Sequence, residues 1–382
     1  MRISKTILPI LLVFSFLLNV QAQDRHFTLF NFAPLVTNPA YTGAYEGTVR
    51  VGGLFRDQSL NIPGLSNVYL TQDFFVDAPL LNVRKRDWVG VGINIYNDEA
   101  GTFGLGYQTF HASVAYHLSL DKKNDNVLTL GIQGGTVNRS ISGFRGRLGT
   151  AYEDVVGVDP TGSADGLSPF GTTGGGNNQM DPNSSFFDLG AGLLLKSKMN
   201  KATDIEVGFS LQHITRNFVL GDTLGTRNTY SLEGLRDNDD FTIPTLFVLH
   251  GQYNVDLTDV WSLSPSFLFQ QTQNQNEAVI QFLGGYRLLK REIRDDGRKG
   301  KLIKDKDAPK IRFGLGYRLG DALQVLLGFE KGDFRAGIGY DLTLSTLADA
   351  NGGNGAIEIA ANYIFRIYKQ PEVDPTILCP KF

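Results

Sequence analysis

The stretch Ile311–Thr343 constrains the fold of this 382-residue chain most strongly, because apolar and polar residues alternate along it with a period of two. Successive side chains of a β-strand point to opposite faces. The stretch therefore predicts three antiparallel strands, each with one apolar and one polar face. The apolar positions are Ile311, Phe313, Leu315, Tyr317 and Leu319, then Leu323, Val325, Leu327 and Phe329, then Phe334, Ala336, Ile338, Tyr340 and Leu342.

A soluble β-sandwich would show the same alternation, so the length of the runs and the chemistry of their faces must decide. Runs of about ten residues fit a tilted strand that spans a membrane. Tyr and Phe lie near the ends of the apolar face, as in the aromatic girdles of outer-membrane barrels, whereas the other face consists of Gly, Arg, Asp and Glu. These features favour the wall of an outer-membrane barrel.

Residues 1–22 have the organisation of a signal peptide. Arg2 and Lys5 form a basic start, Ile7–Leu18 is an apolar core, and Val20-Gln21-Ala22 is a small-residue cleavage motif. The apolar run is too short to span a bilayer as an anchor. We therefore expect cleavage near Ala22 and a protein that leaves the cytoplasm.

The charge and composition of the chain exclude several classes of protein. The formal net charge is −3, and loss of Arg2 and Lys5 leaves 34 − 39 = −5, which gives no reason to expect a nucleic-acid partner. No later segment approaches the run of about 18 apolar residues that a transmembrane helix needs. The 44 glycines and the lack of Leu-rich helical stretches indicate an all-β chain. The single Cys379 is expected to be an unpaired residue of the tail.

Counting segments of period two gives about fourteen strands, an even number, as in single-chain bacterial barrels. The sequence thus predicts an all-β fold, a transmembrane antiparallel β-barrel of outer-membrane type that spans residues 47–368 and is followed by a tail, 369–382. Besides the three strands of Ile311–Thr343, the expected strands are Gly47–Arg56, Asn67–Val76 (of ambiguous facing), Asp87–Asn97, Tyr107–Leu120, Val127–Asn138, Ser185–Ser197, Asp204–His213, Thr242–Val255, Val260–Gln271, Glu277–Leu289 and Gly355–Ile367.

The connections between these strands provide a second test. If the N-terminus is periplasmic, odd-numbered connections face the cell exterior and should be long, and even-numbered ones should be tight turns. Long exterior loops are expected at about 139–184 and 214–241. The tenth connection, 290–310, breaks the rule because it is long, charged and periplasmic. It is either a solvated loop or an arm that binds a periplasmic partner; the candidate docking residues are Arg291, Arg294, Arg298, Lys299, Lys301, Lys304 and Lys306.

The chemistry-bearing residues show no catalytic, cofactor-binding or metal-binding constellation. His111 and His117 share the inner face of one strand, but six residues place them roughly 20 Å apart, too far to chelate one metal ion. The charged residues expected on the inner face have mixed signs, which suggests a salt-bridged, blocked lumen; they are Arg50, Glu206, Arg312, Glu330, Arg335, Asp341 and Glu358. We therefore expect a non-enzymatic protein.

Residues 23–46, between the cleavage site and the first strand, do not read as a strand because Pro34 and Pro39 interrupt them. An Asn-Pro that initiates a turn would cap the periplasmic mouth, so this segment is expected to be a periplasmic or plug segment. The segment has an aromatic lead-in followed by the motif positions Asn31, Pro34, Asn38, Pro39, Ala40, Tyr41 and Gly43. With these residues it closely resembles the start of the PorP/SprF family of the type IX secretion system in Bacteroidota.

The resemblance implies an integral outer-membrane barrel that supports secretion or surface anchoring of type IX cargo, such as large adhesins, with a link to gliding motility in some members. It implies as partners outer-membrane lipid, the secretion machinery with its periplasmic components, and the C-terminal domains of secreted adhesins. An alternative is a transporter of hydrophobic solutes similar to the FadL family, which also combines a fourteen-strand barrel with an Asn-Pro-Ala element. A barrel enzyme would need Ser, His and Asp partners that the sequence does not bring together.

Overall fold

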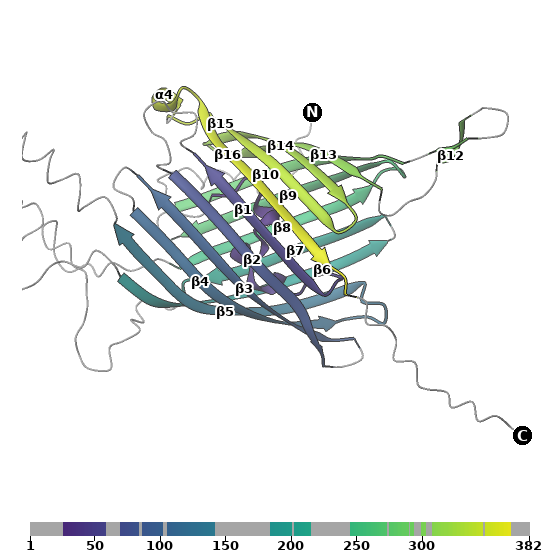
Figure 1. Ribbon diagram of the computed structural model, residues 1–382, viewed down its shortest axis with the longest axis horizontal. Helices are drawn as coiled ribbons and strands as arrows, with labels where there is room; N and C mark the ends of the chain where they lie inside the picture. Colours follow the sequence, from purple (N-terminus) through teal and green to yellow (C-terminus); the bar gives the residue numbers. More distant parts are fainter. Residues whose placement is uncertain are drawn as a thin grey trace, which may run out of the picture.

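The fold, seen in a computed structural model, is a closed antiparallel barrel of fourteen strands (Figure 1). The structure describes residues 26–58, 69–83, 86–101, 105–141, 184–200, 202–214, 245–272, 275–289, 291–293, 299–302, 308–346 and 348–367. The barrel strands are β1 (Val49–Asp57), β2 (Tyr69–Asn82), β3 (Trp88–Ala100), β4 (Leu105–Ser119), β5 (Asn126–Ile141), β6 (Ser184–Asn200), β7 (Thr203–Gln212), β8 (Leu246–Asp256), β9 (Trp261–Thr272), β10 (Gln275–Arg287), β13 (Lys310–Arg318), β14 (Ala322–Lys331), β15 (Phe334–Thr343) and β16 (Asn354–Phe365).

Each barrel strand pairs with its neighbours in the chain, and the first and last strands pair to close the wall. We call the β1–β16 pair the closing seam. Its register runs without a shift from Val49 opposite Phe365 to Asp57 opposite Ile357. The predicted fold class and strand count are therefore confirmed.

The two faces of the wall differ as the alternation predicts. On the outer face Leu315 is 59% exposed and Leu327 56%, whereas Gln324 on the inner face is fully buried. Strand β2, whose facing the sequence left open, directs Phe74 outward and Phe75 into the barrel. The outer face is thus the apolar surface that a lipid bilayer requires. Among the described residues, no helix is both long and apolar enough to cross a membrane.

The two ends of the barrel differ in their connections. The chain enters β1 and leaves β16 at one end, which we call the terminal end; we call the other the loop end. The terminal end carries a two-stranded hairpin of β11 (Arg291–Ile293) and β12 (Lys299–Leu302), and the loop end carries the short helix α4 (Ala348–Asn351), as Figure 1 shows.

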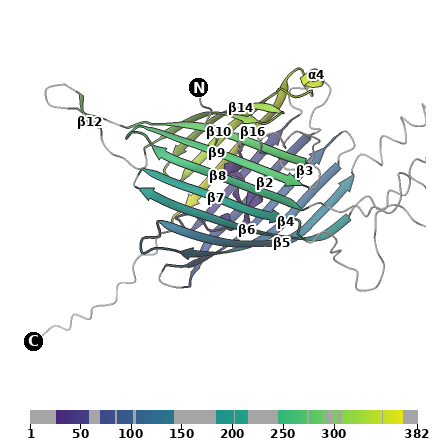
Figure 2. The same ribbon diagram turned by 180° about the vertical axis from the view of Figure 1, so that it is seen from behind.

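Residues 26–46 lie inside the barrel, and we call them the lumenal segment. Both views show it in purple, enclosed by the strands (Figures 1 and 2). It contains three short helices, η1 (Phe30–Phe32), α2 (Pro34–Thr37) and η2 (Pro39–Tyr41). The segment runs from the loop end, where Thr28 bonds Glu358, to the terminal end, where Gly43 bonds Asp77.

The structure corrects two details of the strand and loop assignment. Strand β2 continues to Asn82, past the expected end at Val76, because a bulge between Pro79 and Leu81 accommodates the proline within the ladder. The 290–310 connection contains the β11–β12 hairpin, so it is not wholly a loop.

The expectation that all odd-numbered connections are long is also wrong. The third, ninth and eleventh are short, because only residues 101–104, 273–274 and 319–321 separate their strands. Gly101 and Gly320 have φ values of +78° and +74°. A glycine adopts this conformation without a steric cost, so the chain can reverse within a few residues. The strands that flank the two long connections end at Ile141 and Gln212 and resume at Ser184 and Leu246. The interiors of the expected exterior loops lie outside the described residues.

A charged residue in the middle of the outer face should destabilise the barrel in lipid, whereas one just past the end of a strand should not. We expect Leu315→Arg, within β13, to lower the free energy of unfolding in lipid by about 2–4 kcal/mol. Leu344→Arg is the matched control, since this leucine is similarly exposed but follows the end of β15. Urea titration in liposomes measures both; equal losses would contradict the assignment of the outer face to lipid.

Candidate functional site

The lumenal segment is shaped by its two prolines. Pro34 and Pro39 stand at the first positions of α2 and η2, where a fixed φ favours a helix and the missing N–H is not needed. Asn38, between them, has an extended backbone and caps η2, because its Oδ1 accepts the N–H of Ala40 at 2.9 Å. The result is a compact turn that directs the Asn38 side chain toward the wall.

The Asn38 amide joins this turn to the backbone of the barrel wall. Its Nδ2 donates to the carbonyl oxygens of Leu193 and Phe209, at 3.0 and 3.2 Å, and lies 3.1 Å from Nε2 of His250. Leu193 and Phe209 are opposite one another on β6 and β7. Asn38 is completely buried, so the carbonyl acceptors require an NH₂ donor and the cap requires an oxygen. Only an amide side chain supplies both.

Tyr41 reaches a second polar group, toward the terminal end. Its hydroxyl donates to Glu206, its ring stacks on His250 with centroids 5.2 Å apart, and Lys196 completes the group with an ion pair to Glu206 at 2.9 Å. Burial and the nearby Glu206 carboxylate raise the pKa of the Tyr41 hydroxyl well above its usual range. The hydroxyl therefore stays protonated and remains a donor.

Gly43 fixes the end of the motif at the terminal end of β2 and β3. Its N–H donates to Asp77 at 2.7 Å, and its carbonyl accepts from Nε1 of Trp88 at 2.9 Å. Its φ of +71° and the approach of Gly90, whose Cα would be 2.7 Å from an added Cβ, exclude a larger residue. Arg50 pairs with the same Asp77 and donates to the carbonyl of Tyr41.

Glycines of the inner wall make room for the motif. An added Cβ on Gly131 would overlap the backbone of Pro39 and Ala40, and one on Gly192 would overlap Oδ1 of Asn38. From the sequence alone, these glycines indicate only that they belong to the polar inner face of the wall. The structure shows that they form the surface on which the motif lies.

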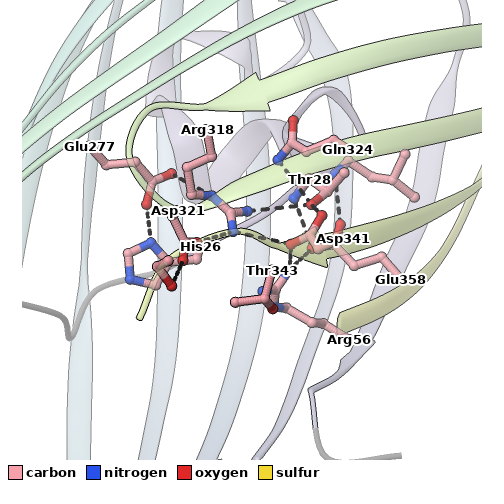
Figure 3. A network of polar contacts seen from close by, with 12 residues as sticks. His26, Thr28, Arg56, Glu277, Arg318, Asp321, Gln324, Asp341, Thr343 and Glu358 are labelled. Atoms are coloured by element: carbon pink, nitrogen blue, oxygen red, sulfur yellow. Dashed lines mark hydrogen bonds and ion pairs between the residues drawn. The ribbon is translucent and has the colours of Figure 1, made fainter. Parts of the chain in front are cut away.

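The other end of the lumenal segment is bound by a buried network of charges, shown in Figure 3. The Glu358 carboxylate accepts the backbone N–H groups of Thr28 and Leu29, at 2.8 and 2.6 Å, and also pairs with Arg56. The Thr28 hydroxyl donates to Asp341 and accepts from Gln324 at 3.1 Å. The carbonyl of Thr28 accepts from Gln281 at 2.7 Å, so every polar group of Thr28 is bonded to the wall.

Arg318 connects this network to the neighbouring strands. Its Nη1 donates to Asp341 at 3.1 Å and to Asp321 at 3.0 Å, and its Nε lies 3.6 Å from Glu277. Glu277 also contacts Nδ1 of His26, the first residue that the structure describes. Charges so deeply buried are tolerated only when they are paired and hydrogen-bonded.

Between these polar groups, the lumenal segment packs an apolar core inside the barrel. Its Phe27, Leu29 and Phe30 contact wall residues that point inward, among them Leu54, Tyr96, Val248, Leu268, Val279 and Leu326. The sequence carried a signal for this contact, because Leu326 falls out of phase in β14, between two outward apolar residues. Neither this core nor the bonds of Glu358 to the backbone of Thr28 and Leu29 were expected from the sequence.

The charged residues expected to point inward do so. Arg50, Glu206, Arg312, Glu330, Asp341 and Glu358 form ion pairs within the barrel, and Arg335 lies in phase with the inward Gly337 and Gly339 but is exposed.

The other sequence-derived candidates have different environments. Asn31 is exposed, unlike the other motif positions in the lumenal segment. Of the docking candidates, Arg291, Lys299 and Lys301 lie on the β11–β12 hairpin, and Arg294, Arg298, Lys304 and Lys306 lie outside the described residues.

His111 and His117 lie on the inner face and serve separate contacts. His111 lies 3.1 Å from Asp188, which also accepts from His213 at 3.0 Å. Nε2 of His117 lies 2.8 Å from the carbonyl of Thr42, and its ring stacks on Trp88. Within the described residues no group of three or more His, Cys, Asp or Glu side chains is placed to hold a metal ion.

Comparison with known protein families decides the identity of the chain. The model of the family described as type IX secretion system membrane protein PorP/SprF matches residues 19–363, which include the lumenal segment and nearly the whole barrel. The chain belongs to the PorP/SprF family. It is thus a membrane protein of the type IX secretion system with a fourteen-strand barrel. A search of curated proteins found no match.

Solved structures of transporters and channels match the chain at low sequence identity. The toluene transporter TbuX of Ralstonia pickettii is 12% identical, with a TM-score of 0.45 over 88% of this chain and 94% of the transporter. A FadL homologue of Pseudomonas aeruginosa is 10% identical, with a TM-score of 0.41 over 86% and 93%. The toluene transporter TodX of P. putida is 12% identical, with a TM-score of 0.43 over 88% and 95%.

Replacing Asn38 with aspartate tests the amide contact with little change of shape. Asn38→Asp sets a carboxylate oxygen against two carbonyl oxygens in a buried site, so we expect a loss of more than about 3 kcal/mol in the free energy of unfolding. Asn31→Asp is the control, because this motif residue is exposed. Thermal unfolding of the purified protein in detergent measures both variants, and equal stability would show that the Asn38 bonds do not hold the segment.

Proposed function

We propose that this protein is a non-enzymatic outer-membrane component of the type IX secretion system that supports secretion or cell-surface anchoring of specific cargo, such as large adhesins. Membership of the PorP/SprF family over residues 19–363 carries the proposal. The implied partners are the secretion machinery and the C-terminal domains of the cargo proteins. In a host that glides, the same cargo would link the protein to motility.

The contacts inside the barrel favour a protein that binds other proteins at its ends over one that conducts them through its lumen. The lumenal segment contacts the inner wall on both sides: β6 and β7 through Asn38, and β16 through Thr28 and Leu29. Its removal would leave the buried carboxylates of Glu358, Asp341 and Asp77 without the hydrogen bonds that the segment donates, which is costly. A barrel that keeps its own N-terminal segment inside offers its ends, rather than its lumen, to other proteins.

The same contacts weigh against transport of hydrophobic solutes, the second function that the sequence suggested. Such a transporter needs a free apolar surface in the lumen. Here the inward apolar residues, such as Leu54 and Leu326, pack against Phe27, Leu29 and Phe30 of the chain itself. The remaining described inner face is dominated by ion pairs and polar side chains.

We assign the terminal end to the periplasm, because single-chain barrels place short turns there and long loops outside. The β11–β12 hairpin then extends into the periplasm from the connection 290–310, which carries nine basic and five acidic residues. A projecting basic hairpin suits a periplasmic partner with an acidic surface.

Deletion of the gene in its native host tests the function directly. We expect at least one adhesin-like type IX cargo to be lost from the cell surface, while the uptake of hydrophobic solutes is unchanged. Surface proteomics and solute uptake measure the two outcomes, and restoring the gene should restore the cargo. Normal surface display of all type IX cargo, or a defect in uptake alone, would contradict the proposal.

Excision of residues 291–307, joined by a short glycine linker, tests the hairpin. The hairpin is a separate two-stranded sheet, so we expect the barrel to fold normally while a periplasmic partner is lost from pull-downs of outer membranes. Lys122→Gln with Lys123→Gln is the control, because these exposed lysines lie in another turn of the terminal end. Unchanged co-purification of periplasmic proteins would remove the hairpin as a docking site.

A further inference from the structure

The closing seam is the strand pair whose two members are most distant in sequence, since β1 begins the barrel and β16 ends it. Strands joined by a tight turn are held close together by the chain itself, but β1 and β16 are not. Closing such a long loop costs conformational entropy that local contacts must offset. Side-chain contacts across the seam are therefore especially important for keeping the barrel closed.

Arg56 and Glu358 form the buried ion pair of this seam. They are directly opposite in the register of β1 and β16. Nη1 of Arg56 donates to Glu358 and also to Asp341 of β15, at 3.2 Å. Glu358 is fully buried and Arg56 is 5% exposed, so neither can exchange its partner for bulk water without a rearrangement.

The lumenal segment completes the coordination of the same two carboxylates. In Glu358, Oε1 accepts the N–H of Thr28 as well as Arg56, and Oε2 accepts the N–H of Leu29. In Asp341, Oδ1 accepts the Thr28 hydroxyl, while Oδ2 accepts Arg56 and Arg318. Figure 3 shows Thr28 directed at both carboxylates. The segment thus bonds to β15 and β16 at the groups that also bind β1.

A second cross-strand ion pair, less buried than the first, lacks this third participant. Arg312 of β13 and Glu330 of β14 also pair across adjacent strands on the inner face, at 2.7 Å. Arg312 bonds additionally to Ser264 of the wall, and the described residues of the lumenal segment make no hydrogen bond to either side chain. Participation of the segment thus separates the seam pair from the Arg312–Glu330 pair. The segment also bonds to two cross-strand pairs nearer the terminal end, Arg50–Asp77 of β1 and β2 and Lys196–Glu206 of β6 and β7.

We propose that residues 26–29 act as a staple of the closing seam, so that insertion of the lumenal segment and closure of β1 on β16 form one cooperative step. The segment stays in the lumen because the seam is closed, and the loop-end half of the seam stays closed because the segment is there. A partner that withdrew these residues would open the wall between β1 and β16.

Hydrogen–deuterium exchange of the full-length protein in detergent tests the coupling. We compare Glu358→Gln with Glu330→Gln, which removes the charge of a less buried cross-strand pair away from the seam. Glu358→Gln should speed exchange about tenfold or more both in the loop-end halves of β1 and β16 and in residues 26–31, because it weakens charge-assisted hydrogen bonds to both. Glu330→Gln should leave both regions unchanged. Faster exchange in only one of the two regions, or in neither, would overturn the proposal.

Deletion of residues 26–31 tests whether loss of the segment in turn loosens the closing seam. Exchange should rise at the loop-end half of the seam and stay unchanged where β13 pairs with β14. Phe55→Cys with Ile359→Cys, in a Cys379→Ser background, places two thiols directly opposite each other on the outer face of the seam. The resulting disulfide should restore slow exchange, or restore assembly if the deletion prevents it.

Leu315→Cys with Val325→Cys supplies the control disulfide, because these residues are opposite each other on β13 and β14. It should not rescue the deletion variant. An unchanged seam after the deletion, or equal rescue by both disulfides, would show that the segment does not act through the seam.

Discussion

The structure depends on hydrogen bonds between the lumenal segment and the inner face of the barrel. Fourteen strands enclose an interior with room for additional chain, and the polar groups on that inner surface need hydrogen-bond partners, which either water or further protein must supply. The segment supplies many of them through its backbone: the N–H groups of Thr28, Leu29 and Gly43 all donate to wall carboxylates. The wall and the segment therefore satisfy hydrogen-bonding groups of each other.

Charged wall residues hold both ends of the segment, and the terminal end adds neutral contacts and close packing. There Gly43 and Tyr41 bond to Asp77 and Glu206, while the Asn38 amide bonds to backbone carbonyls and wall glycines allow its approach. Toward the loop end, charged side chains bind the backbone of Thr28 and Leu29. The middle is an apolar core around Phe27, Leu29 and Phe30. A segment fixed along its length in this way fits the proposed role of the barrel as a platform for other proteins.

The wall could be predicted from the sequence because lipid imposes a strict period of two. Leu315 and its neighbours must be apolar on one side, whatever lies on the other. No such rule fixes the residues that face the lumen or the partners that they bind. Glu358 and Arg56 show that the inner face is charged, but nothing local shows that Glu358 binds the backbone of Thr28, which is 330 positions away in the chain. Likewise, a glycine such as Gly192 indicates a small inner residue without naming Asn38 as its neighbour. Loop lengths were a weaker guide, because a glycine such as Gly320 permits a tight turn at either end of the barrel.

A disulfide between the segment and the wall tests the central claim that the barrel works with its lumenal segment in place. The hydroxyls of Thr42 and Ser113 are 2.8 Å apart, and both side chains are buried. Thr42→Cys with Ser113→Cys, in a Cys379→Ser background, would lock the segment to β4 in cells of the native host. We predict that the locked protein displays type IX cargo on the cell surface as the unlocked protein does. Loss of surface cargo that is reversed when the disulfide is reduced would show that the segment must leave the lumen, and would contradict the account.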